Sequence, residues 1–499
     1  MKTSQRATRR PLTLPKAPTG IRGLDEITHG GLPRGRPTLI CGAAGCGKTV
    51  LALEFLVRGA TEFGEPGVFM AFEESGRELI ANVRSLGFDL SGLVGRRRIS
   101  LDHVRIERSE IQETGEYNLE GLFVRLEHAV RSVGAKRVVL DTVEALFASL
   151  PNEMILRSEL RRLFRWLKDR QLTTIITGER GERSLTRHGL EEYVADCVIL
   201  LDHRVSDQLT TRRMRIVKYR GSSHGTNEYP FLITPSGLSV LPITSLRLDH
   251  AISRQRESTG VPGLDDMLGG RGFYRGSSLL VSGGPGTGKT NLAAHFAHAA
   301  CARGKRALFI SYEESGPQIL RNTRSIGLDL QGWLRRGLLQ IHSTRPTVYG
   351  LERHLVHLHD QIDQFDPHVV VMDPIEGISS SRDAQELKPT LIRVLDYLKH
   401  RGTTALFTTA TQSSGEDDSQ WGMSSLMDAW LWLRNVEING ERNRALYVLK
   451  SRGMAHSNQV REFAITDRGF QFFGPCVASG RVLTGSTDGN AQPQKGRNP

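Results

Sequence analysis

The sequence predicts an α/β fold of two tandem domains, each with a mostly parallel sheet, helices on both faces and antiparallel strands at its end. Three observations lead to this prediction. The chain has 499 residues, which is enough for two or three domains. In each half, apolar strand-like runs alternate with stretches of helical periodicity. Each half also carries a glycine-rich phosphate loop, and other short motifs recur in the same order.

The phosphate loop of the second half, residues 283–290, reads Gly-Gly-Pro-Gly-Thr-Gly-Lys-Thr. It follows the apolar run 278–281 and precedes a helical run, which is the strand, loop and helix order of a P-loop. In such a loop the backbone N–H groups and the helix N-terminus bind phosphate oxygens. Lys289 is expected to reach the β- and γ-phosphates, and the Thr290 hydroxyl to bind Mg²⁺. The alternative is a glycine-rich turn that binds nothing.

A second P-loop, residues 42–49, follows the apolar run 38–41 and precedes another helical run. The two loops together predict ATP and Mg²⁺ as cofactors. The residues expected to bind nucleotide are Gly42, Gly45, Gly47, Lys48, Thr49, Gly283, Gly286, Gly288, Lys289 and Thr290.

Internal repetition indicates two homologous domains rather than one large one. The matching segments keep their order at offsets that fall from 240 to 232: 19–26 with 259–266, 71–76 with 311–316, 84–90 with 324–330, and 217–221 with 449–453. In the first half, strands are expected around 38–41, 68–72, 137–141, 174–177 and 198–201, helices at 119–133 and 154–169, and antiparallel strands at 212–219 and 229–233.

The boundaries follow from these repeats and from composition. Residues 1–16 are expected to be a basic disordered arm, 17–245 the first domain, 246–257 a polar linker, 258–477 the second domain and 478–499 a disordered tail. The net charge is +12, but 1–16 carry +5 and 478–499 carry +2, so much of it lies outside the predicted domains.

The composition, 38% hydrophobic and 24% charged, is typical of a soluble globular protein. No apolar run approaches the ~18–20 residues of a membrane-spanning helix, and the basic N-terminus lacks the apolar core of a signal peptide. A cytoplasmic protein without a membrane partner is expected. The five cysteines show no metal-ligand spacing and are predicted to be reduced and non-catalytic.

Acidic residues at strand ends are the candidate partners of the P-loops. Asp141 and Asp373 each end an apolar strand-like run, where a carboxylate can hold Mg²⁺ together with Thr49 and Thr290, although an aspartate there can also be a helix cap. The pairs Glu73-Glu74 and Glu313-Glu314 also follow predicted strands, and the carboxyl ends of parallel strands face the nucleotide. One glutamate of each pair is expected to orient or deprotonate the attacking oxygen; the alternative is a solvated acidic turn.

A Lys-x-Arg-Gly motif occurs late in each domain, with Lys218 and Arg220 in the first and Lys450 and Arg452 in the second. Cations that stabilise a γ-phosphate can come from a neighbouring subunit, which makes these residues catalytic candidates. The alternative is a solvated strand face.

Together these residues resemble the KaiC family of circadian-clock ATPases, within the RecA-like fold group. The resemblance covers residues 17–475 and rests on the doubled Thr-Gly-x-x-Gly-Leu-Asp, P-loop and Glu-Glu-Ser motifs, on 217–221 followed by Ser223-His224, and on 436–441 leading to 450–453. It implies two tandem RecA-like domains in a double-ring homohexamer with ATP between subunits. The first domain would be a slow ATPase, and the second a serine/threonine autokinase that also removes its phosphate, forming a timer or signalling switch.

The resemblance also implies roles for individual residues. Glu73 and Glu313 look like the catalytic bases, with Glu74 and Glu314 beside them. Aligned through Asp428, the phosphorylated pair of the family falls at Ser424-Ser425, and two serines look like the non-cyanobacterial branches; the alternative is a helix cap or turn. A KaiB-like protein or a response-regulator and histidine-kinase system would be the partner.

Two other classes of protein share the P-loop. A DNA-threading RecA-like motor is favoured by the pI near 9.7 and by the basic loop 181–189, with Arg183, Arg187 and His188. The equivalent loop 413–422 is acidic, with Glu416, Asp417 and Asp418, so nucleic acid is not the expected partner. The third reading is a signalling scaffold in which ATP only assembles the ring, and the intact glutamate pairs argue against it.

Overall fold

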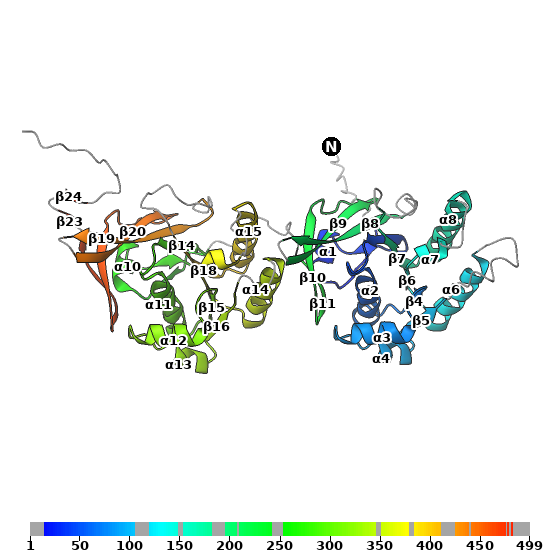
Figure 1. The fold of residues 1–499 in the computed structure, drawn as a ribbon, viewed down its shortest axis with the longest axis horizontal. Helices are drawn as coiled ribbons and strands as arrows, with labels where there is room; N and C mark the ends of the chain where they lie inside the picture. The colour runs from blue at the N-terminus through cyan, green and yellow to red at the C-terminus, as the bar shows by residue number, and fades with distance from the viewer. Residues whose placement is uncertain are drawn as a thin grey trace, which may run out of the picture. The chain divides into compact units, whose positions relative to one another are not determined.

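The structure, a computed structural model, describes residues 14–104, 119–147, 153–181, 195–206, 209–241, 253–345, 351–378, 384–410, 425–438, 441–475, 477–478 and 481–482. The chain divides into two compact units, residues 1–245 (unit 1) and 246–499 (unit 2). Each unit combines a central sheet with packed helices (Figure 1). Within the described ranges, no helix is long and apolar enough to cross a membrane.

The main sheet of unit 1 contains, among the described residues, parallel strands followed by antiparallel ones. In spatial order they are β5 (Ile99–His103), β4 (Gly67–Ala71), β6 (Arg137–Asp141), β7 (Thr173–Glu179), β3 (Pro37–Gly42), β8 (Cys197–Ser206), β9 (Leu209–Tyr219), β10 (Glu228–Thr234) and β11 (Gly237–Val240). The helices are α1 (Leu24–Ile27), α2 (Lys48–Glu62), α3 (Gly76–Arg84), α4 (Leu90–Gly95), α6 (Glu120–Val133), α7 (Glu144–Phe147) and α8 (Glu153–Asp169).

Unit 2 repeats this strand order. Its sheet runs β16 (Leu339–Ser343), β15 (Ala307–Ser311), β17 (Val369–Asp373), β18 (Thr404–Ala410), β14 (Ser278–Gly283), β19 (Ala429–Ile438), β20 (Glu441–Ser451), β21 (Arg461–Thr466) and β22 (Gly469–Pro475). Its helical elements are α10 (Pro262–Met267), α11 (Lys289–Ala302), α12 (Gly316–Arg324), α13 (Gln331–Arg335), α14 (Leu351–Phe365), the 3₁₀ turn η2 (Ile375–Ile378) and α15 (Ala384–His400). The predicted fold class is therefore confirmed in both halves.

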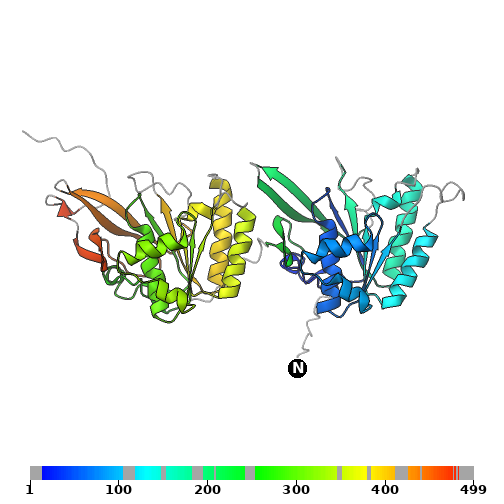
Figure 2. The same cartoon turned by 60° about the horizontal axis from the view of Figure 1, so that its bottom comes forward.

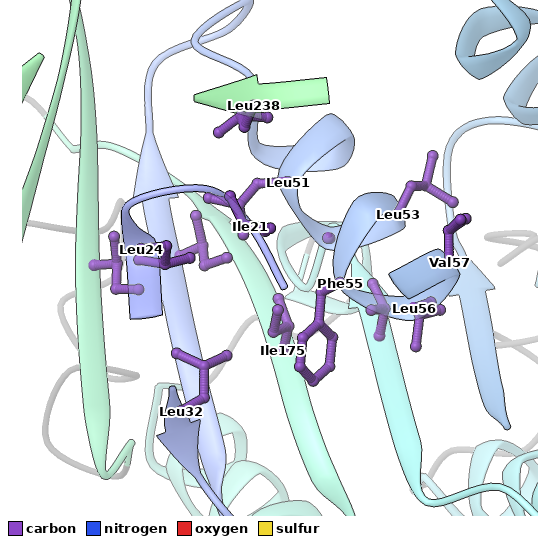
Figure 3. Packing of buried hydrophobic residues seen from close by; sticks show 14 of the residues in the cluster. Ile21, Leu24, Leu32, Leu51, Leu53, Phe55, Leu56, Val57, Ile175 and Leu238 are labelled. Atoms are coloured by element: carbon purple, nitrogen blue, oxygen red, sulfur yellow. The ribbon is translucent and has the colours of Figure 1, made fainter. Parts of the chain in front are cut away.

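Both faces of the central parallel strands β3, β4, β6, β14, β15 and β17 are buried, since every residue of these strands is buried and alternate residues point to opposite sides of the sheet. In β3, Ile40 belongs to the core under α2, whereas Leu39 and Cys41 belong to the core under α6 and α8. Figure 2 shows helices on both sides of each sheet. Figure 3 shows the first of these cores, where Phe55 of α2 packs toward Ile175 of β7.

The strands and helices expected in the first half are confirmed, but the two outer strands β5 and β11 were missed. β5 is a sheet edge whose residues after Ile99 are only partly buried, and it alternates apolar with polar side chains as a loop can. β11 has only four residues and begins directly after the turn that ends β10. Short edge strands carry too little apolar pattern to be recognised from sequence.

The predicted disordered arm, linker and disordered tail each include a few residues that belong to short strands next to the domains. Lys16 belongs to β1 (Lys16–Ala17), which pairs with β2 (Leu32–Pro33). The end of the predicted linker forms β12 (Arg256–Glu257), paired with β13 (Phe273–Tyr274). In the predicted tail, Ala478 and Arg481 pair within a short β23–β24 hairpin (Val477–Ala478 and Arg481–Val482). In each case backbone pairing orders a polar segment that lacks apolar periodicity. The remainder of the arm, linker and tail lies outside the described residues.

Candidate nucleotide site

Each P-loop joins the central strand of its sheet to the helix that follows. Gly42 ends β3 and Lys48 begins α2; Gly283 ends β14 and Lys289 begins α11. Both helices start at a left-handed glycine and have no side-chain cap, unlike α3, which Ser75 caps with a capping box. The N–H groups of a first helical turn have no intrahelical partner, so these two helix ends can bind an anion.

The loop glycines fit a phosphate-binding role. A Cβ on Gly42 would lie 2.5 Å from the carbonyl oxygen of Leu201, and one on Gly283 would lie 2.4 Å from that of Leu433, so both positions exclude a side chain. Gly45 and Gly286 have φ angles of 73° and face open space, where a Cβ would meet nothing within 4 Å. Each loop is therefore packed against the neighbouring strand at its first glycine and open to a ligand at its central glycine, as a nucleotide phosphate requires.

The glycines that precede the two P-loop helices are required both by their backbone angles and by their close contacts. Gly47 and Gly288 have φ angles of 103° and 99°, in the left-handed region that favours glycine. A Cβ on them would lie 2.9 Å and 2.5 Å from the Cδ1 atoms of Ile233 and Ile465, respectively. The antiparallel strands β10 and β21 thus hold both loops from the side.

The two P-loop lysines fold back over their own loops. Lys48 Nζ donates to the carbonyl oxygens of Gly42 and Ala43 at 2.9 and 3.1 Å, and Lys289 Nζ donates to those of Gly283 and Gly284 at 2.7 and 3.0 Å. Burial lowers the pKa of Lys289, while nearby carboxylates led by Asp373 oppose the shift. Each ammonium group thus lies against the first two residues of its loop, from which it can turn to phosphate oxygens.

Asp141 and Asp373 lie at the ends of β6 and β17, and both are buried. Their Oδ1 atoms accept hydrogen bonds from the hydroxyls of Thr177 and Thr408 on the neighbouring strands. Burial raises the pKa of Asp141, and hydrogen bonds from Thr177 and Thr49 oppose that shift. Asp141 thus lies within hydrogen-bonding range of the P-loop threonine.

The donor set fits Mg²⁺ rather than a metal held by protein alone. Over the described part of the chain, no three His, Cys, Asp or Glu side chains lie close enough to hold a metal ion. Mg²⁺ usually binds through one or two protein oxygens together with phosphates and waters. One carboxylate and one threonine hydroxyl beside each loop match this need.

The structure distinguishes the two glutamates of each pair. Glu73 is exposed and its Oε1 accepts a hydrogen bond from Thr142 Oγ1 at 3.0 Å, directly after Asp141. Glu74 instead accepts from Asn82 Nδ2 of α3 at 3.1 Å.

Unit 2 repeats this difference, because Glu314 accepts from Asn322 Nδ2 of α12 at 3.1 Å, whereas the charge of Glu313 influences Lys289. The charge of the first glutamate of each pair thus acts on a residue of the candidate site, Glu73 on Asp141 and Glu313 on Lys289, whereas the second glutamate is hydrogen-bonded to a helix.

Two further glutamates, which were not predicted from the sequence, lie in this region. Glu144 follows Asp141 by three residues, and its Oε1 accepts from the backbone N–H of Glu179, the last residue of β7, at 2.6 Å. Glu376 follows Asp373 by three residues, and its Oε1 accepts from Thr409 Oγ1 near the end of β18. Burial raises the pKa of Glu376. The doubled Asp-x-x-Glu spacing was the signal that could have found them.

The Lys-x-Arg residues lie away from the P-loop of their own unit. Lys218 pairs with Val198, which lies beside Leu39, three residues before Gly42 in the sheet. Lys450 likewise pairs with Trp430, which lies beside Leu280, three residues before Gly283. At about 3.3 Å per residue, each lysine is roughly 10 Å below its loop.

The arginines lie farther still, because β9 and β20 end at Tyr219 and Ser451, one residue before them. Arg220 and Arg452 donate their backbone N–H to the carbonyl oxygens of Asp196 and Asp428 at 2.8 and 2.7 Å. The N–H of Asp428 in turn bonds to Ser278, the first residue of β14. Arg220 and Arg452 therefore lie at the end of the sheet opposite the phosphate loop.

The candidate acceptor Ser425 lies at this same opposite end. It is exposed, it precedes β19 by four residues, and its carbonyl oxygen accepts a hydrogen bond from Arg452 Nη2 at 2.7 Å. Ser424 lies outside the described residues, as do most of the loops 181–189 and 413–422. Each unit thus brings together a P-loop, an aspartate and a glutamate, and keeps the Lys-x-Arg cations apart from them.

Comparisons with known proteins agree with this arrangement. The model of a family described as the KaiC ATPase matches residues 17–245 and again 257–475. The chain is 56% identical over 478 residues to the circadian clock protein KaiC2 of Synechocystis sp., covering 95% of this chain and 84% of that protein. It is 38% identical over 475 residues to the circadian clock oscillator protein KaiC of Synechococcus elongatus, covering 94% and 91%. The KaiC of Parathermosynechococcus lividus is 35% identical over 477 residues, covering 95% and 88%.

Proposed function

The chain belongs to the KaiC ATPase family, and from that premise we propose that its two units divide hydrolysis and phosphoryl transfer between them. Unit 1 hydrolyses ATP slowly. Unit 2 transfers the γ-phosphoryl group of ATP to Ser424 or Ser425 and later removes it. The protein then acts as a phosphorylation-state timer or signalling switch.

The observation that carries this proposal is the separation, within unit 2, of the P-loop from the Lys-x-Arg cations and Ser425. Arg452 and Ser425 lie at the end of the unit 2 sheet opposite the P-loop. A serine there is out of reach of the nucleotide bound by its own unit, and so are the cations. A neighbouring chain that presents this end to the P-loop would complete the site, which is the arrangement expected of a closed homohexameric ring.

In this arrangement each residue of unit 2 has a defined task. Lys289 and the loop N–H groups hold the phosphates, and Lys450 and Arg452 of the next chain neutralise charge on the transferred group. Mg²⁺, held by Thr290 and through water by Asp373, would supply further charge neutralisation when bound. Glu313 accepts the hydroxyl proton as the serine oxygen bonds to phosphorus and the bond to the leaving ADP oxygen breaks.

A sequence difference supports the division of labour. At the positions of Ser424 and Ser425, counted back from Asp428, unit 1 has Glu192 and Tyr193 before Asp196. Unit 1 therefore lacks the serine acceptors, and water is left as the acceptor for the phosphoryl group bound by Lys48. Glu73, held by Thr142, would orient that water.

The test is incubation of the full chain with Mg²⁺ and γ-labelled ATP, followed by mass spectrometry of its peptides. Label is expected on Ser424 or Ser425, and it should be absent from Ser424→Ala/Ser425→Ala and strongly reduced in Glu313→Gln. Glu73→Gln serves as the matched control, because it alters the same position in unit 1 and should leave the labelling intact. Label that persists undiminished in Glu313→Gln, or that never appears on either serine, would contradict the proposal.

A further inference from the structure

The two units differ at one pair of positions beside the edge strand. In unit 1, Asp102 of β5 and Arg125 of α6 form an ion pair of 2.6 Å. In unit 2, His342 occupies the position of Asp102, because both strands pair in the same register with β4 and β15. His357 occupies the position of Arg125, since each lies eight residues before the last residue of its helix, α6 or α14.

The two units also differ at a third position, on the same pair of helices. Leu122 of α6 is buried in an apolar core, and its counterpart eleven residues before the end of α14 is His354, which is also buried. The ring of His354 stands edge-on to that of Tyr312, with centroids 6.2 Å apart. The positions of an ion pair and a leucine in unit 1 are therefore occupied by three histidines in unit 2.

These histidines line a cavity of about 200 Å³ between β16, the end of β15 and α14. Its other polar lining side chains include Tyr312, Thr344 and Gln361. We propose that this cavity is a second ligand site, specific to unit 2, that binds a small oxyanion such as phosphate or a short carboxylate. The site is separate from the P-loop and does not depend on the kinase activity proposed above.

The lining favours an oxyanion over other ligands. Among the described residues that line the cavity none is acidic, and all the polar side chains can donate hydrogen bonds. A metal ion is disfavoured, because the described His, Cys, Asp and Glu side chains provide no set of three with metal-binding geometry. Among the described lining residues, the imidazoles are the groups that can carry a positive charge, and protonated imidazoles bind oxyanions through charge-assisted hydrogen bonds.

The binding should depend on pH in a defined direction. Burial lowers the pKa of His342, so its ring is neutral at pH 8 and takes up a proton only as the pH falls below its ordinary value of about 6.5. The other titratable lining groups are His354, His357 and Tyr312, and no Asp, Glu, Lys or Arg lines the described wall. An oxyanion prefers the protonated rings, and its affinity should rise as the pH falls.

One residue that lines the cavity, Tyr312, is also hydrogen-bonded to a residue of the candidate active site. Tyr312 directly precedes Glu313, and its backbone N–H donates to the carbonyl oxygen of Asp373 at 2.9 Å. A Cβ on Gly377 would lie 2.1 Å from Tyr312 Cβ, so the tyrosine is held tightly against η2. A bound anion would therefore contact a side chain that is fixed to the strand end bearing Asp373.

The experiment is a calorimetric titration of the full chain, with both P-loops first saturated with a non-hydrolysable ATP analogue and Mg²⁺. Inorganic phosphate is the probe in one arm and malonate in the other, at pH 6 and pH 8. One anion should bind per chain in at least one arm, with an affinity about tenfold or more higher at pH 6, as expected for a hydrogen bond to a charged group.

The variant His342→Asp/His354→Leu/His357→Arg rebuilds the three residues of unit 1 and should abolish this binding. His357→Gln, at an exposed position, tests the same point with a smaller change and should weaken the binding and reduce its pH dependence. His400→Asp, an exposed histidine of α15 outside the lining, should bind as the parent does. Absence of binding at pH 6 in both arms, or equal binding by the parent and the rebuilt variant, overturns the proposal.

Discussion

At the scale of single residues, the glutamate pairs are chemically identical in sequence and differ only in their hydrogen bonds. Thr142 holds the carboxylate of Glu73 beside the end of β6, where its charge acts on Asp141, whereas Asn82 holds that of Glu74 on α3. A carboxylate beside that strand end can orient a water molecule. One that is bonded to a helix side chain mainly stabilises the turn between strand and helix.

Glu73→Gln is therefore expected to lower ATP hydrolysis by unit 1 about 10²–10⁴-fold, since it removes a proton acceptor without changing the shape of the side chain. Glu74→Gln should have a much smaller effect. Steady-state phosphate release measures both, in a chain that also carries Glu313→Gln so that unit 2 contributes little.

Asn82→Ala is the control for a positioning role, because it deletes the hydrogen bond to Glu74, whereas a glutamine at position 74 keeps an acceptor oxygen for Asn82. Both changes should have a much smaller effect than Glu73→Gln. Equal losses in Glu73→Gln and Glu74→Gln would show that the hydrogen-bond pattern does not separate their roles.

At the scale of elements, the two P-loop helices differ in the residue that lies six positions after the P-loop lysine and in how it contacts the antiparallel strands. Glu54 of α2 accepts a hydrogen bond from the backbone N–H of Leu238 at 2.6 Å and from Arg58. His295 of α11 instead packs edge-on against Phe470 of β22, with centroids 5.3 Å apart. Its Nε2 atom is buried without a hydrogen-bond partner among the described residues.

This difference predicts an acid-sensitive unit 2. Burial lowers the pKa of His295 to about 4, below the value of about 6.5 expected in the unfolded chain. The unfolded state therefore binds the proton first, and stability is lost as the pH falls from 6.5 toward 4. Between pH 7.5 and pH 5 the loss from this group is about 2 kcal/mol.

Urea unfolding without nucleotide measures this effect. Tryptophan fluorescence follows it, because four of the five tryptophans lie in unit 2 and Trp166 alone lies in unit 1. His295→Leu should lose about 2 kcal/mol less than the parent over the same pH range. His128→Leu, which replaces an exposed histidine of α6, should keep the parent's dependence. Parallel pH profiles for the parent and His295→Leu would rule out this explanation.

At the scale of the whole molecule, the central feature is that the P-loop and the Lys-x-Arg cations of each unit lie at opposite ends of one sheet. The register places Lys450 below Gly283, and Arg452 lies beyond the first residue of β14. In the proposed arrangement a chain gains a complete site by association with the next chain, so assembly and catalysis should be linked. Nucleotide between the subunits would then favour the ring.

Complementation between two inactive variants tests this directly. Arg452→Ala and Glu313→Gln should each label Ser425 poorly when alone. When equal amounts are mixed and reassembled with Mg²⁺ and ATP, about a quarter of the interfaces of a closed ring pair an intact Glu313 with an intact Arg452. Labelling should recover toward that fraction.

Sedimentation checks that the variants and the mixture form the same oligomer. No recovery in a fully assembled mixture would mean that the two residues act within one chain, contrary to the register argument.

The sequence by itself determined the doubled α/β architecture, both P-loops, and the aspartates and glutamates at the strand ends. These depend on short-range spacing and periodicity, which neighbouring residues express without help from the rest of the fold. Only the tertiary structure decided how the two glutamates of each pair are hydrogen-bonded and that the Lys-x-Arg cations lie at the far end of the sheet. Those outcomes depend on strand order and register between segments as far apart as Thr38 and Cys197, which neighbouring residues alone do not encode.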